Sequence, residues 1–233
     1  MVNALIKVHT PLILVNFKTY SEATGKKAMK LTEISEKISL ETNVCICVAP
    51  QFTDIAMIAQ SKSVPVFAQH IDPISYGNFT GQVLPESVKE AGAIGTLINH
   101  SEKRLKLDDV EATISRAREI NLISVVCVIN PVVSAIAAAL KPDIINVEPP
   151  ELIGTGIPVS KAKPEIVAGT VEQVKKIDPN IVVLCGAGIT RGEDVTAALK
   201  LGAEGVLMSS SIVKAKDPYN VLLEFANAIR IVT

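Results

Sequence analysis

Eight short runs of apolar, mostly β-branched residues recur along the chain, separated by more polar segments. They are Leu12 to Phe17, Val44 to Ala49, Val64 to Ala68, Thr96 to Asn99, Ile123 to Ile129, Ile144 to Val147, Ile181 to Cys185 and Val206 to Met208. Runs that do not alternate with polar residues are typical of strands buried on both faces, and such strands belong to parallel sheets covered by helices. The pattern therefore predicts an α/β protein built from repeated strand-helix units.

The segments between the runs carry helix signals. Asp108 followed by Glu111 reads as a capping box, Pro85 suits a first helical turn, and Gly92 and Gly202 suit left-handed helix ends. Eight such units in 233 residues leave no room for a second domain, so we expect residues 1–233 to form a single closed (β/α)8 TIM barrel. An open doubly wound sheet is the alternative fold.

Leu122 to Leu140 is apolar and nearly long enough to cross a membrane. Asn130 and Pro131 interrupt it, its first half is β-branched and its second half is alanine-rich. Proline at the start of the second half suits a first helical turn. We therefore expect a strand, a turn and a helix here, and no membrane partner.

Charge and cysteine content exclude several functions. The chain has 23 Lys and Arg against 24 Asp and Glu, a net charge of -1 and no basic run, so a nucleic-acid partner has no electrostatic support. The four cysteines lie in apolar runs without a Cys-x-x-Cys pair, at Cys45, Cys47, Cys127 and Cys185. They read as buried free thiols of a cytoplasmic protein, without a disulfide or a zinc site.

Polar residues follow several of the runs, where the carboxyl ends of barrel strands form the active-site face. They are Asn16, Lys18, Gln69, His70, Asn99, His100 and Glu148. The last two runs end in Gly186-Ala187-Gly188 and Ser209-Ser210-Ser211. Small residues there let backbone N–H groups approach an anion, and a following helix adds a favourable dipole, so we expect a small phosphate ester as substrate.

Each of these residues also has an ordinary structural interpretation. Lys18 alone could be a surface lysine, His100 a hydrogen-bonded core histidine, and Gly188 part of a tight turn. Glu148 is harder to explain structurally, because a carboxylate at the end of a buried strand is costly unless it is paired or used. The combination at one barrel mouth favours catalysis more than any single member does.

Four segments resemble the signature segments of triosephosphate isomerases, and they occur in the right order. They are Asn16-Phe17-Lys18, Asn99-His100-Ser101-Glu102, Glu148 to Gly156, and Cys185 to Ile189. The Gly77 to Gly81 loop resembles that family's interface loop. The short chain and Glu148-Pro149-Pro150-Glu151-Leu152 resemble the archaeal branch, which tends to form tetramers rather than dimers. Two departures are Glu151, where the family usually has Trp, and Ser209-Ser210, where it has Gly-Gly.

The resemblance implies interconversion of dihydroxyacetone phosphate and glyceraldehyde 3-phosphate through an enediolate, with no cofactor or metal. A glutamate base beside a neutral histidine is the established arrangement of that family, which assigns Glu148 and His100. Lys18 would supply positive charge with Asn16 beside it, and Glu102 would pair with Lys18. The remaining substrate-binding residues implied are Ile153, Gly154, Gly188, Ser209 and Ser210.

The segment from Pro149 to Gly156 reads as a hinged lid, with prolines at one end and glycines at the other. A stiff surface loop is the alternative interpretation. Two other functions remain open: a metal-dependent sugar-phosphate epimerase or aldolase, and a non-catalytic phosphate-binding barrel. Only three histidines are present to bind a metal, and loss of catalysis usually removes catalytic residues.

Overall fold

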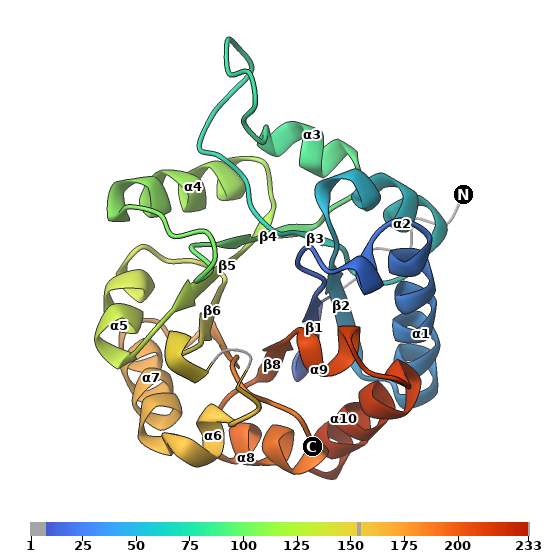
Figure 1. Cartoon of the computed structure of the whole chain (residues 1–233). Coiled ribbons are helices and arrows are strands. Elements are labelled where there is room, and N and C mark those ends of the chain that lie inside the picture. Colours follow the sequence, from blue (N-terminus) through green and yellow to red (C-terminus); the bar gives the residue numbers. More distant parts are fainter. Residues whose placement is uncertain (1–7, 153–154, 233) are drawn as a thin grey trace.

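The computed structural model describes residues 8–152 and 155–232. Eight parallel strands form one sheet in the order β2-β1-β8-β7-β6-β5-β4-β3, and a parallel bridge between Val48 and Val66 closes it. Helices surround the strands (Figure 1). The strands are β1 (Leu12–Asn16), β2 (Cys45–Ala49), β3 (Phe67–Ala68), β4 (Gly95–Ile98), β5 (Ile123–Val128), β6 (Ile144–Val147), β7 (Val182–Cys185) and β8 (Gly205–Met208). The predicted barrel is confirmed.

Strand boundaries agree with the apolar runs to within a few residues, except at β3. The run from Val64 predicts a longer strand than the observed Phe67–Ala68. Pro65 lies inside that run and has no N–H to give to a sheet. Its carbonyl accepts the Val48 N–H at 3.0 Å, so this part of the run joins β2 through isolated contacts instead of a continuous ladder.

Alternate residues of each strand face the barrel interior or the helices, which explains why the runs are unbroken. The interior cluster contains Leu12, Leu14, Cys45, Cys47, Ala49, Phe67, Leu97, Val125, Ile144, Leu184 and Leu207. Their neighbours along each strand pack against the surrounding helices. The interior is thus filled by side chains, and any site must lie at one end of the barrel.

The helices follow the strands in sequence. They are α1 (Lys26–Thr42), α2 (Ile55–Ser61), α3 (Pro85–Glu90), α4 (Leu107–Glu119), α5 (Pro131–Ala139), α6 (Val159–Ala162), α7 (Pro164–Ile177), α8 (Gly192–Lys200), α9 (Ser210–Val213) and α10 (Pro218–Val232), with short 3-10 turns η1 (Ser21–Ala23), η2 (Phe52–Asp54) and η3 (Pro150–Leu152). Pro85 and Pro131 open their helices, as predicted. Gly92 and Gly202 have φ values of 101° and 94°, as expected for left-handed helix ends.

The capping box predicted at Asp108 is wrong. Helix α4 already begins at Leu107, and its N-cap is Lys106, which makes no side-chain cap bond. Asp108 lies inside the first turn, where its carboxylate accepts the Asp109 N–H at 3.1 Å. Acidic residues are favourable at this position because they complement the helix dipole, and that preference produces the same sequence pattern as a cap.

The apolar segment 122–140 folds as predicted, into β5, a turn and α5. The Asn130 side chain accepts the Val133 N–H at 2.9 Å and caps α5. Within the part of the chain that the structure describes, no helix is both long and apolar enough to span a membrane. All four cysteines are buried and free, also as predicted.

Candidate active site

A cavity of about 480 Å³ opens where the barrel strands end. It is lined by residues from the ends of β1, β4, β6, β7 and β8: Lys18, Tyr20, His100, Glu102, Glu148, Thr155, Gly156, Ala187, Gly188, Ile189, Thr190, Leu207, Met208, Ser209, Ser210 and Ser211. The mouth of a barrel is the usual place for catalysis in this fold. Asn16 does not line this cavity; it lines a neighbouring one together with Lys18 and His100.

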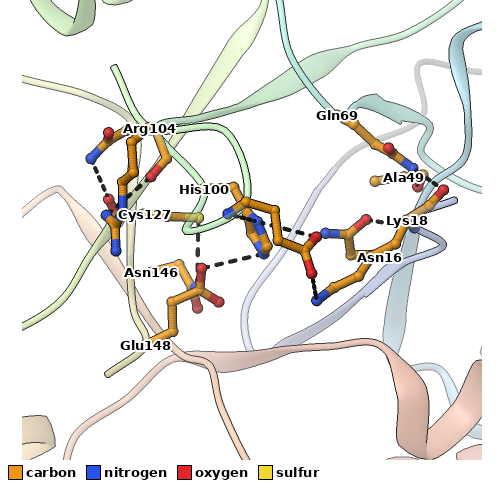
Figure 2. Close-up of polar contacts among 11 residues, drawn as sticks. Asn16, Lys18, Ala49, Gln69, His100, Arg104, Cys127, Asn146 and Glu148 are labelled. Atoms are coloured by element: carbon orange, nitrogen blue, oxygen red, sulfur yellow. Dashed lines mark hydrogen bonds and ion pairs between the residues drawn. The ribbon is translucent and has the colours of Figure 1, made fainter. Parts of the chain in front are cut away.

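Lys18 is held in a strained backbone conformation with a φ of 48°. The Asn16 side chain accepts the Lys18 N–H at 2.9 Å, and the Gln69 amide donates to the Lys18 carbonyl at 2.9 Å. The ammonium lies 2.8 Å from a Glu102 carboxylate oxygen, which confirms the predicted pair. These contacts aim one positive charge at the cavity (Figure 2).

His100 is buried, with 6% of its surface exposed. The Glu102 backbone N–H donates to His100 Nδ1 at 3.2 Å, whereas the Glu102 carboxylate is 3.7 Å from that nitrogen, beyond hydrogen-bond distance. An accepting Nδ1 places the proton of a neutral ring on Nε2. The residues after His100 form a turn, closed by the Lys103 N–H, which donates to the His100 carbonyl.

Glu148 extends the barrel interior by one residue beyond β6. Its N–H donates to the Val128 carbonyl at 2.8 Å, and only 3% of its surface is exposed. Oε1 lies 3.4 Å from His100 Nε2 but has no hydrogen-bond partner among the described residues. A buried carboxylate oxygen without a donor is costly, so this geometry fits a group that a ligand will complete.

The loops after β7 and β8 provide the small residues of the cavity. Ala187 and Gly188 both have positive φ, and a Cβ on Gly188 would lie 1.8 Å from the Ile157 carbonyl oxygen. Ser209 precedes α9, and its hydroxyl is buried without a partner among the described residues. Backbone N–H groups of a first helical turn lack partners within the helix, so this side of the cavity suits an anion.

Comparisons of the sequence with known proteins agree with these features of the site. The sequence model of the family described as triosephosphate isomerase matches residues 11–230. The chain belongs to the triosephosphate isomerase family. Triosephosphate isomerases from Methanocaldococcus jannaschii and Methanobacterium bryantii are each 53% identical to it, the first over 94% of this chain and 100% of the relative, the second over 94% and 97%. That of Methanothermus fervidus is 55% identical over 92% and 96%.

The segment predicted to be a lid in this member of the triosephosphate isomerase family is described only in part. Ile153 and Gly154, two of the predicted substrate-binding residues, lie outside the described residues. Turn η3 begins two residues after Glu148, and Thr155 and Gly156 line the cavity on the other side of the gap. Glu151, at the usual Trp position, is a surface residue paired with Lys163.

Three features of the site have no counterpart among the predicted site residues. Tyr20 and Thr190 line the cavity from loops beyond the strand ends, so no strand in the sequence marks their position. Asn146 is a buried polar residue inside the barrel beneath Glu148. Its signal was present in the sequence, because it is a carboxamide in an otherwise apolar run.

Proposed function

We propose that this chain interconverts dihydroxyacetone phosphate and D-glyceraldehyde 3-phosphate at the described cavity, as an aldose-ketose isomerase of glycolysis and gluconeogenesis. Membership in the triosephosphate isomerase family supports the reaction. The observation that carries the residue assignment is the buried Glu148 Oε1, which lies 3.4 Å from His100 Nε2 and has no hydrogen-bond partner among the described residues. A base and a proton donor, both buried, are thus next to each other.

Glu148 removes a proton from the carbon that bears the hydroxyl group of dihydroxyacetone phosphate. The electron pair of the broken C–H bond forms the C=C bond of the enediolate, and the carbonyl π electrons move to oxygen. His100 Nε2–H donates to that oxygen, where the negative charge develops. His100 Nε2 then gives its proton to the former carbonyl oxygen and takes up the proton of the neighbouring hydroxyl, whose oxygen forms the new C=O bond. The C=C electron pair takes the proton back from Glu148 at the former carbonyl carbon, and glyceraldehyde 3-phosphate results.

The residues around Glu148 and His100 bind the substrate. Lys18 brings positive charge to the phosphate and to the developing oxyanion, and Asn16 supports it by accepting its N–H. Gly188, Ser209 and Ser210 hold the phosphate through backbone N–H groups and hydroxyls on the opposite side. Serine at 209 and 210 keeps the N–H that glycine would offer and adds a hydroxyl.

The lid from Pro149 to Gly156 completes the site when it closes. Lid closure is a known property of this enzyme family. Ile153 and Gly154 would reach the phosphate, exclude water from Glu148 and hinder loss of phosphate from the enediolate.

The protein is a homo-oligomer, a tetramer rather than a dimer, and it is located in the cytoplasm. Each subunit is a single barrel domain that spans residues 1–233. The Gly77 to Gly81 loop supports self-association, because the segment between β3 and α3 projects beyond the ring of helices (Figure 1). Tyr76 and Phe79 on it are 71% and 41% exposed. The reaction needs no cofactor, and neither nucleic acid nor membrane is a partner.

A coupled assay on the purified protein tests the function. Dihydroxyacetone phosphate is the substrate, and an added dehydrogenase oxidises the aldehyde product. The assay is run once with a chelator and once without it. We expect turnover that resists the chelator. Substrate binding without turnover would favour the non-catalytic barrel, and turnover lost on chelation would favour the metal-dependent epimerase or aldolase.

A further inference from the structure

Asn146 is a fully buried carboxamide in the middle of the barrel, on β6 two residues before Glu148. Residues two apart on a strand face the same side, so Asn146 lies directly beneath the base, with Ile144 of the apolar interior beneath it. Its Nδ2 donates to Cys127 Sγ at 3.7 Å, and its Oδ1 has no hydrogen-bond partner among the described residues.

This arrangement does not favour stability. A buried carboxamide loses its hydration, and a sulfur atom is a weak acceptor in return. Replacing such a group with an apolar side chain of the same shape is often neutral or stabilising. Polar groups that break the local rules of a core without a visible gain in stability are commonly found at functional sites.

Asn146 and the base share their neighbours. Asn146 and Cys127 are paired directly across β5 and β6. A Cβ on Gly186 would lie 2.8 Å from Asn146 Nδ2 and 3.1 Å from Glu148 Cβ, so the carboxamide and the base pack against the same glycine. Figure 2 shows Cys127, Asn146 and Glu148 together on one side of His100.

We infer that Asn146 is a positioning residue for the base: it donates to the Cys127 sulfur, turns the thiol proton toward the Glu148 carboxylate, and thereby holds that carboxylate against His100. This inference rests on the proposed function. A sulfur that accepts an N–H keeps its own S–H free to donate. The carboxylate then has one fixed weak donor behind it and the reacting carbon in front, which keeps it both oriented and basic.

The state of the thiol agrees with this role. Burial raises the pKa of Cys127 well above its ordinary value, and the nearby negative charge of Glu148 raises it further. The thiol therefore stays protonated and able to donate. The titratable groups around the base are His100 at 3.4 Å, Cys127 behind it, and Lys18, Glu102 and Arg104 on the side of β1 and β4.

Asn146→Leu tests the inference, because leucine has a similar size and removes both polar atoms. We expect a thermal midpoint equal to or above that of the wild type, a kcat about tenfold lower, and an unchanged KM, since one net hydrogen bond corresponds to roughly that factor. With Cys127→Ala as the second variant, the double variant should be no slower than the slower single one. Thr96→Val, a buried change on β4 far from the base, is the matched control and should leave kcat unchanged.

Asn146→Asp provides a second variant that is nearly isosteric and does not depend on leucine fitting the barrel. A second carboxylate beneath the base disfavours its charged form, so the acidic limb of the kcat/KM pH profile should move to higher pH. Wild-type kcat in Asn146→Leu, independent effects of the two single variants, or an unmoved limb in Asn146→Asp would each overturn the inference. A wild-type protein that fails to isomerise would instead refute the proposed function.

Discussion

The two halves of the barrel mouth differ in how completely their polar groups are paired. In the half formed after β1, β3 and β4, Gln69 donates to two carbonyl oxygens, and Asn99 donates to the Cys127 carbonyl and accepts the Leu105 N–H. Lys18 is paired with Glu102 in the same half. We call this the tied half. In the half formed after β6, β7 and β8, which we call the open half, several buried polar atoms lack a hydrogen-bond partner among the described residues.

Four buried side-chain atoms lack a hydrogen-bond partner among the described residues, and three of them lie in or beneath the open half. They belong to Asn146, Glu148 and Ser209. The tied half is thus organised before any ligand arrives, which avoids reorganisation during the reaction. The open half keeps groups that a phosphate and an enediolate can satisfy. Loss of an open-half group should therefore affect catalysis or binding more than folding.

The strongest test of this comparison is Glu148→Ala. Removing the base should lower kcat by about 10³- to 10⁴-fold, while folding is kept because a costly buried charge disappears. The kcat of Glu148→Asp should lie between those of Glu148→Ala and the wild type, about 10²-fold below the wild type. The shorter side chain withdraws the carboxylate from the substrate by one methylene. Steady-state kinetics and a thermal melt check both variants. Near wild-type turnover in Glu148→Ala would end the assignment.

His100→Ala should have the second-largest effect, because it removes the side chain that lies between the two halves. Turnover should drop by about 10²- to 10³-fold, the usual loss for one oxyanion donor, with a modest change in KM. The same assay and a melt separate catalysis from stability. If the whole loss came from misfolding, His100 would be a structural core histidine.

Ser209→Ala should act on binding alone. Its hydroxyl is buried and has no hydrogen-bond partner among the described residues, so we expect a thermal midpoint that does not fall. KM should rise about three- to tenfold with kcat nearly unchanged, since the contact serves ground state and transition state alike. A clear drop in stability with an unchanged KM would place Ser209 in the framework of the barrel instead.

Glu151→Gln should have the smallest effect. The Glu151–Lys163 pair is exposed on both sides, and such pairs contribute little to stability because water and salt screen them. We expect the free energy of unfolding to stay nearly unchanged and kcat/KM to stay within about threefold. Raising the salt concentration should have the same small effect on the wild type. A tenfold fall in kcat/KM would show that this pair controls the lid.

The barrel could be predicted from sequence because burial on both faces of a parallel strand leaves a direct signal. Ile144 to Val147 matches β6 at both ends, and the break at Pro131 separates β5 from α5. The errors arose where one local pattern has two physical causes. An acidic residue such as Asp108 suits a helix cap as well as a first helical turn. Pro65 interrupts a run that is otherwise suitable for a strand.

The site was predictable where side chains directly follow strands. Lys18, His100 and Glu148 all line the cavity, and the Lys18–Glu102 pair was expected. The hydrogen bonds that fix them could not be predicted, because they depend on positive φ at Lys18 and on a backbone N–H reaching His100 Nδ1. Asn146 could not be assigned to the site on the same ground, because it lies inside β6 and not at a strand end.

A crystal structure of the protein with phosphoglycolate, a mimic of the enediolate, tests most directly whether the substrate completes the open half. We expect the phosphate at Gly188, Ser209 and Ser210 and the carboxylate group between His100 Nε2 and Glu148. The Ser209 hydroxyl and Glu148 Oε1 should then both have partners, while the bonds of Gln69 and Asn99 stay as they are. An inhibitor bound elsewhere, or a site in which the tied half rearranges and Ser209 stays unpaired, would contradict the division into two halves.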